Sequence, residues 1–208
     1  MVLNLLTNAI AKVWPMLTIF MVVLIAIRVS YLRINHERFV FYKEFLNLIF
    51  VIYVLILFQL LTDAEMNSAV NGTGFNLVPF TEMFRYKVGS PMFYSNVLGN
   101  IFIFVPFGYF VSGYVKATKI SHILFISAIS SLTVELVQLQ IGRSCDIDDI
   151  ILNVVGAIAG FLLYIALNAI KKHMPRFLQS DLFYNIICVI LCIICVIYFT
   201  KIMGLGWF

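Results

Sequence analysis

Residues 129–160 read ISSLTVELVQLQIGRSCDIDDIILNVVGAIAG, two strongly apolar segments that meet at a polar junction. Four of the ten acidic residues of the chain fall within the fifteen positions from Glu135 to Asp149. Ionisable groups are costly in hydrocarbon, and they usually face the interior of a helix bundle or a wet cavity. Their concentration between two apolar segments makes this junction the first candidate for a functional site.

The composition is that of a membrane protein. Of 208 residues, 62% are hydrophobic and only 12% are charged, and the mean hydropathy is +1.03. The apolar stretches predict six spans, most of which approach the roughly 20 residues that an α-helix needs to cross a bilayer: 12–28, 44–61, 95–115, 120–141, 150–170 and 182–203. No hydrophilic stretch is long enough to fold separately. We therefore expect an all-α fold, a polytopic transmembrane bundle of about six helices that forms one integral membrane domain over residues 1–208.

The basic residues predict the orientation of this bundle. Nine of the fourteen Lys and Arg residues flank the first, third and fifth loops, and five lie on the other side. The positive-inside rule therefore places both termini, the 62–94 loop and the acidic junction outside the cytoplasm of a multi-pass cell-membrane protein. Because this flanking bias explains the net charge of +4, a basic surface for nucleic acid is not needed.

The loop between the second and third spans changes character along its length. Residues 62–74 are polar and rich in Asn and Gly, whereas residues 75–94 mix aromatic side chains with charged ones. Aromatic and polar groups together suit the headgroup level of a bilayer. We expect an interfacial aromatic loop, which either seats the helices or forms a lid over a substrate.

The third span carries its own polar features. Asn96 and Asn100 are four residues apart and share a helix face, and Gly99 beside them permits close helix approach. Pro106 and Gly108 are predicted to interrupt the helix near its middle. A kinked helix whose asparagines bind neighbouring spans would explain the same pattern without a functional site.

Two helix faces at the junction carry rows of polar or small residues: Ser131, Glu135 and Gln138 on the fourth span, and Asp149, Asn153, Gly156 and Gly160 on the fifth. The glycine pair of the fifth span allows tight helix contact. We expect this contact to bring the polar residues of the fifth span close to Glu135 or Asn100. The carboxylates would then surround Arg143.

A structural explanation competes with this functional one. Asp146 or Asp148 caps the fifth helix in that interpretation, and Asp149 is favoured by the helix dipole, with each effect worth about 1 kcal/mol. Capping accounts for one or two acids. Four acids with an arginine and two amides at the same depth exceed what capping requires.

Four ordered motifs carry a family resemblance: Asn76-Leu77-Val78-Pro79-Phe80; Asn96, Gly99, Asn100, Phe104, Pro106 and Gly108; Glu135 and Gln138; and Gly142, Arg143, Asp146, Asp148, Asp149, Asn153, Gly156 and Gly160. This series, over about residues 40–170, resembles the successive motifs of VanZ-like membrane proteins. The name-giving member is associated with teicoplanin resistance, without the target-altering chemistry of vancomycin resistance. The resemblance implies a role in the cell envelope of a Gram-positive bacterium, in glycopeptide resistance or envelope homeostasis.

Two mechanisms from different classes follow for the junction. As an enzyme acting on a lipid-linked or envelope substrate, the protein would use Glu135 or Asp149 as general acid or base and Arg143 to hold an anionic group. As a non-enzymatic binding module, it would engage a membrane lipid or the glycopeptide antibiotic and alter access to cell-wall precursors. A transporter is less favoured, because the polar site lies near one face rather than at mid-membrane.

The candidate residues fall into three groups. The catalytic candidates are Glu135, Asp149, Arg143 and Asp146. The substrate-binding candidates are Asn76, Asn96, Asn100, Gln138 and Asn153. Asp146, Asp148 and Asp149 form a candidate oxygen site for a divalent cation that bridges to phosphate.

Overall fold

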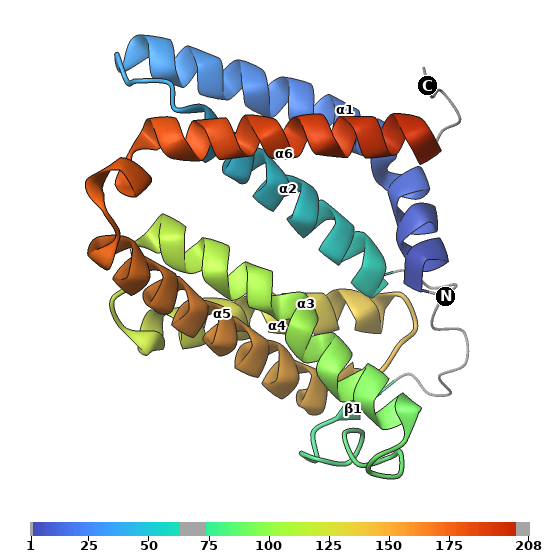
Figure 1. Cartoon of the computed structure of the whole chain (residues 1–208). Coiled ribbons are helices and arrows are strands. Elements are labelled where there is room, and N and C mark those ends of the chain that lie inside the picture. The colour runs from blue at the N-terminus through green and yellow to red at the C-terminus, as the bar shows by residue number, and fades with distance from the viewer. Residues whose placement is uncertain (1, 63–73, 203–208) are drawn as a thin grey trace. The chain divides into compact units, whose positions relative to one another are not determined.

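The protein is all-α, as predicted, in a computed structural model that describes residues 2–62 and 74–202 (Figure 1). Six long helices dominate the described chain: α1 Val2–Ile34, α2 Phe41–Thr62, α3 Pro91–Val115, α4 Ile120–Gln140, α5 Ile147–His173 and α6 Asp181–Ile202. A short 3-10 helix, η2, covers Arg176–Gln179, and two strands of two residues each are β1 Phe75–Asn76 and β2 Cys145–Asp146.

Five helices within the described residues are long and apolar enough to cross a membrane, namely α2 to α6. The remaining predicted span, residues 12–28, falls within α1, and some of its side chains lie outside the described residues. Helix α3 begins four residues before the predicted start at 95. The reason is local, because Ser90 accepts the backbone N–H of Phe93 at 3.2 Å and Pro91 occupies the first turn.

The chain packs as two compact units, one formed by residues 1–19 and 50–167 and the other by residues 20–49 and 168–208. The core of the first unit joins α4 and α5 to the end of α3 through four buried side chains, Ala117, Ile123, Ala157 and Phe161. The polar junction predicted from the sequence lies in this unit.

Three glycines let α3 and α5 approach backbone to backbone. A Cβ atom on Gly108 would collide with the backbone of Ala157, and one on Gly156 or Gly160 would collide with the backbone of α3. The predicted tight contact of the Gly156–Gly160 pair is confirmed. The same prediction for Gly99 is wrong, since no atom lies within 4 Å of a Cβ built there.

Helix α3 runs without a break through Pro106, contrary to the predicted interruption. Proline removes one backbone hydrogen bond and disturbs the preceding turn. In that turn the hydroxyl of Tyr53 donates to the carbonyl of Ile103 at 2.5 Å. A neighbouring helix therefore supplies a donor at the place where proline weakens the backbone ladder.

The second unit ties the start of α6 to the start of α2. The backbone N–H of Tyr42 donates to Oδ1 of Asn185 at 2.9 Å, and the hydroxyl of Tyr42 donates to Asp181 at 3.0 Å. Nζ of Lys43 lies 3.5 Å from Oδ1 of the same aspartate. These polar contacts fix the register of two otherwise apolar helices.

Candidate functional site at the junction of α4 and α5

A short parallel strand pair joins the loop that precedes α3 to the junction. Phe75 pairs with Cys145 and Asn76 with Asp146, and the N–H of Cys145 donates to the carbonyl of Gly74 at 3.0 Å. This pairing joins segments about 70 residues apart. It places Asn76, a predicted substrate-binding residue, directly at the acidic cluster.

The side chain of Asp148 holds the loop in place. Its carboxylate accepts the backbone N–H groups of Phe80 at 2.5 Å, and of Glu82 and Met83 at 2.9 Å each. Phe80 has a φ of +69°, a conformation that bulky residues rarely adopt. Because the side chain of Asp148 is buried, these charge-assisted hydrogen bonds offset the cost of burying its charge and of the strained turn.

Asp146 connects the helix start, the loop and Glu135. One of its oxygens accepts the N–H of Asp148 at 2.9 Å, as an N-cap does, and the other accepts Nδ2 of Asn76 at 3.2 Å. Its own N–H donates to Oε2 of Glu135 at 2.8 Å. Burial raises the pKa of Asp146, although both accepted hydrogen bonds act in the opposite direction. The predicted capping role is confirmed for this residue.

Asp149 contacts α3 rather than the loop. Nδ2 of Asn100 donates to Oδ1 of Asp149 at 2.5 Å, which confirms the expected approach of the fifth span to Asn100. The positive charge of Arg143 interacts favourably with both Asp149 and Glu135.

Two further amide side chains at the junction, those of Asn153 and Gln138, are buried. Nδ2 of Asn153 donates to Oγ of Ser131 at 2.9 Å, which links the polar faces of α5 and α4. Gln138, 2% exposed, lies one turn beyond Glu135. Oδ1 of Asn153 is buried and has no hydrogen-bond partner among the described residues. It is therefore an unsatisfied acceptor at the junction.

One predicted binding residue stands apart from this network. Asn96 is half-buried on α3, one turn before Asn100, and its side chain makes no hydrogen bond within the described part of the chain. Asn76, Asn100 and Asn153 therefore join the site through hydrogen bonds, whereas Asn96 shares only a helix face with Asn100.

The three aspartates have three different partners rather than one common focus. Asp148 faces the loop amides, Asp146 faces Asn76 and the helix start, and Asp149 faces Asn100. Across residues 2–62 and 74–202, no group of three or more His, Cys, Asp and Glu side chains is arranged as metal ligands would be. The residues present do not fit the divalent-cation site suggested by their spacing.

All four carboxylates of the junction accept hydrogen bonds. Asp146 and Asp148 cap α5 and hold the loop, Glu135 accepts the N–H of Asp146, and Asp149 accepts Nδ2 of Asn100. The positive charge of Arg143 lies beside Glu135 and Asp149. Such a set can hold an anionic group at the guanidinium and pass a proton to or from a carboxylate.

Comparison with known proteins agrees with this description. The model of the VanZ/LLP1 family matches residues 45–168, a stretch that contains the loop, the acidic junction and the helices that position them. No curated protein and no solved structure matches the chain. Because the family match takes in more than half of the sequence, the chain belongs to the VanZ/LLP1 family.

Proposed function

We propose that this membrane protein contributes to glycopeptide resistance of the teicoplanin type, or to envelope homeostasis, by acting on a lipid-linked or envelope substrate at the junction of α4 and α5. Arg143 holds an anionic group of the substrate. Glu135 or Asp149 then exchanges a proton with the reacting group. The orientation predicted from the basic residues opens this site to the extracytoplasmic face.

The observation that carries this proposal is the hydrogen-bonded junction itself. Glu135 of α4 accepts the N–H of Asp146, and Asp149 of α5 accepts Nδ2 of Asn100. Four carboxylates and one arginine gather at this junction, and such clusters of ionisable groups are typical of functional sites. Asp148 and Asp146 support the arrangement by fixing the loop and the start of α5.

The loop favours a second candidate, a non-enzymatic binding module. Its apolar side chains point outward, with Phe75 64%, Leu77 67% and Phe80 55% exposed. A surface of this kind at the headgroup level suits contact with lipid tails or with the acyl chain of a lipoglycopeptide. In this alternative the polar site recognises a headgroup without chemical change.

Charge-deleting variants test whether the junction is a site or a scaffold. Glu135→Gln and Asp149→Asn nearly preserve shape, so we expect teicoplanin tolerance to fall to the level of cells without the protein while membrane abundance stays normal. Loss of a general acid or base typically costs a factor of about 10² to 10⁴ in rate. Glu82→Gln, at a partly exposed carboxylate whose side chain pairs with Arg85, is the matched control. Disappearance of both variants from the membrane would instead assign the carboxylates to holding the helices together.

A further inference from the structure

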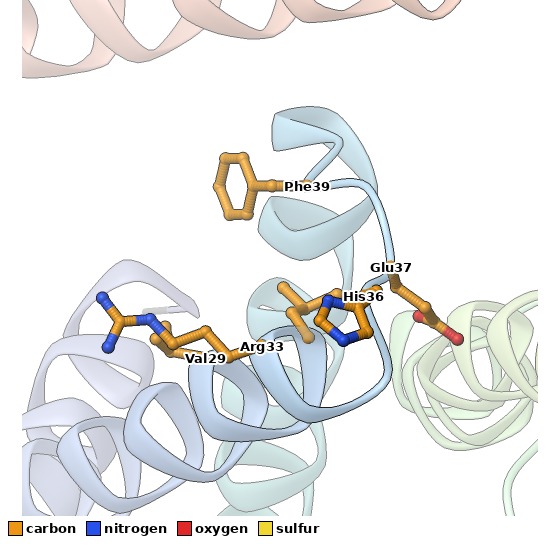
Figure 2. Close-up of a pocket in the computed structure, with 6 residues that line it drawn as sticks. Val29, Arg33, His36, Glu37 and Phe39 are labelled. Atoms are coloured by element: carbon orange, nitrogen blue, oxygen red, sulfur yellow. The ribbon is translucent and has the colours of Figure 1, made fainter.

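A second feature of the molecule lies in the other unit, at the turn between α1 and α2. An open pocket of about 470 Å³ is present there, lined by both apolar and charged side chains (Figure 2). Six residues line it: Val29, Leu32, Arg33, His36, Glu37 and Phe39. None of these residues belongs to the polar junction described above.

The end of α1 creates this pocket. The N–H of Glu37 donates to the carbonyl of Leu32 at 3.1 Å, and the N–H of His36 donates to the carbonyl of Arg33 at 3.5 Å. With His36 in the left-handed conformation at a φ of +51°, this is the Schellman motif that ends many helices. The helix therefore ends here, and His36 and Phe39 of the following turn line the pocket together with Val29, Leu32 and Arg33 of α1.

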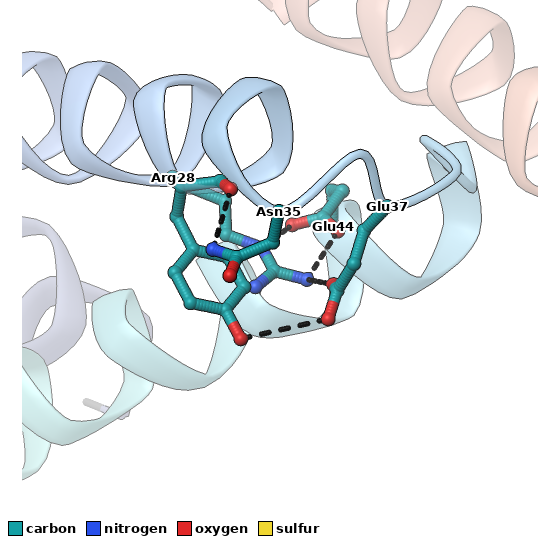
Figure 3. A network of polar contacts seen from close by, with 5 residues as sticks. Arg28, Asn35, Glu37 and Glu44 are labelled. Atoms are coloured by element: carbon teal, nitrogen blue, oxygen red, sulfur yellow. Dashed lines mark hydrogen bonds and ion pairs between the residues drawn. The ribbon is translucent and has the colours of Figure 1, made fainter.

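The single acid of the pocket has a cation nearby. Oε2 of Glu37 lies 3.8 Å from the guanidinium of Arg28, and its other oxygen accepts the hydroxyl of Tyr31 at 3.5 Å (Figure 3). The guanidinium of Arg28 also binds Glu44 with two hydrogen bonds of 2.8 and 2.9 Å. The one positive charge of Arg28 therefore offsets only part of the charge of these two carboxylates.

The charge around the pocket is positive on balance, because three arginines outnumber two glutamates: Arg28, Arg33 and Arg38 against Glu37 and Glu44. Within the described ranges Arg33 forms no ion pair, and its side chain is exposed. Neighbouring Arg38 is likewise exposed and outside the ion pairs of the described residues. Beside these cations lie exposed apolar side chains of the same turn, Ile34 at 77% and Phe39 at 63%. A ligand that fits both features carries a negative headgroup and an apolar tail.

We propose that this pocket binds the headgroup of an anionic phospholipid. The phosphate is held by Arg33 and by His36, the acyl chains run along the exposed apolar side chains of α1, and Phe39 covers the glycerol region. Basic pockets beside membrane helices recognise anionic lipids in this way. In the predicted orientation the lipid belongs to the cytoplasmic leaflet.

Lipid retention by the full-length protein tests this proposal. The purified protein in detergent is mixed with equal amounts of phosphatidylglycerol and phosphatidylcholine, and native mass spectrometry counts each bound lipid. We expect preferential retention of phosphatidylglycerol, lowered about fivefold in Arg33→Gln, the effect typical of one basic residue at a lipid surface. Arg33→Lys should keep most of the preference because it keeps the charge.

Arg176→Gln is the matched control, because it removes the same charge from an exposed position of the same unit outside the pocket. It should leave the preference unchanged. Equal retention of the two lipids by the wild type, or equal losses in Arg33→Gln and Arg176→Gln, would overturn the proposal. Displacement of bound phosphatidylglycerol by excess inorganic phosphate would show a site for free anions and would likewise contradict a lipid site.

Discussion

Single side chains at the junction hold segments that are distant in the sequence. Asp148 is the clearest case, because its carboxylate accepts three backbone N–H groups of the loop that precedes α3. Hydrogen bonds to a charged group contribute about 1.5–3 kcal/mol each. The unusual backbone of Phe80 is therefore maintained by its contacts with Asp148 and not by its own preference.

Asp148→Asn tests this role at the level of individual amides. The asparagine amide group offers one acceptor oxygen in place of two, so at least one charge-assisted hydrogen bond is lost. We expect the amides of Phe80, Glu82 and Met83 to exchange with solvent deuterium at least about tenfold faster, in line with a loss of roughly 1.5–3 kcal/mol.

Glu82→Gln is the matched control for this prediction, because the side chain of Glu82 pairs with Arg85 on the exposed side of the loop at 3.1 Å. It removes a charge from the same segment without touching Asp148. If the three amides keep their wild-type exchange rates in Asp148→Asn, the loop is held by something other than this carboxylate.

At the scale of helices, the contact between α3 and α5 positions the site. Gly108, Gly156 and Gly160 bring the two backbones together, and the same contact brings Asn100 on α3 to Asp149 on α5. Small residues permit this approach in a membrane, where burial of apolar surface does not by itself drive helices together.

Alanine at two glycines of the family motifs should have opposite effects. In Gly156→Ala the new methyl group meets the backbone of Ile101, which a side-chain movement cannot relieve, so we expect a loss of about 3 kcal/mol in unfolding free energy. Gly99→Ala meets open space and should be neutral or slightly stabilising. Thermal unfolding of the purified variants measures both. A Gly156→Ala protein as stable as the wild type would contradict the observed helix contact.

The sequence predicted those features that depend on local patterns. Apolar length predicted the helices, and the spacing of Gly156 and Gly160 predicted a close contact. The spacing could not identify the partner helix, and it misassigned Gly99 because a small residue fits equally well where no neighbour approaches. The pairing of β1 with β2 was not predictable, since two-residue strands carry no alternation of side chains.

The roles predicted for single residues differ from the observed ones for a related reason. The sequence identified the acidic junction as a whole, but it did not separate Asp148 from Asp149. The two roles depend on which carboxylate accepts the loop amides and which accepts Asn100. Every residue except proline has a backbone N–H group, so the sequence does not mark which of these groups will donate to a carboxylate. The same spacing of aspartates is therefore compatible with a metal site and with a loop anchor.

At the scale of the whole molecule, the orientation in the membrane decides which substrates the site can meet. A cysteine at Ser144, in a background without native cysteines, should react with an impermeant maleimide in intact cells. A cysteine at exposed Thr118, on the predicted inner side, should react only after the membrane is permeabilised. The reverse labelling pattern would place the junction in the cytoplasm and remove the basis for an extracytoplasmic substrate.

The most direct measurement of the central claim is mass spectrometry of envelope lipids and polymers from three strains, which carry the wild type, Glu135→Gln or no protein. An enzyme changes many substrate molecules per copy, so we expect a lipid or glycopolymer product present only with the wild type. A binding module works in proportion to its own amount. Identical profiles in all three strains, together with glycopeptide tolerance that scales with the amount of protein, would contradict chemistry at the junction of α4 and α5.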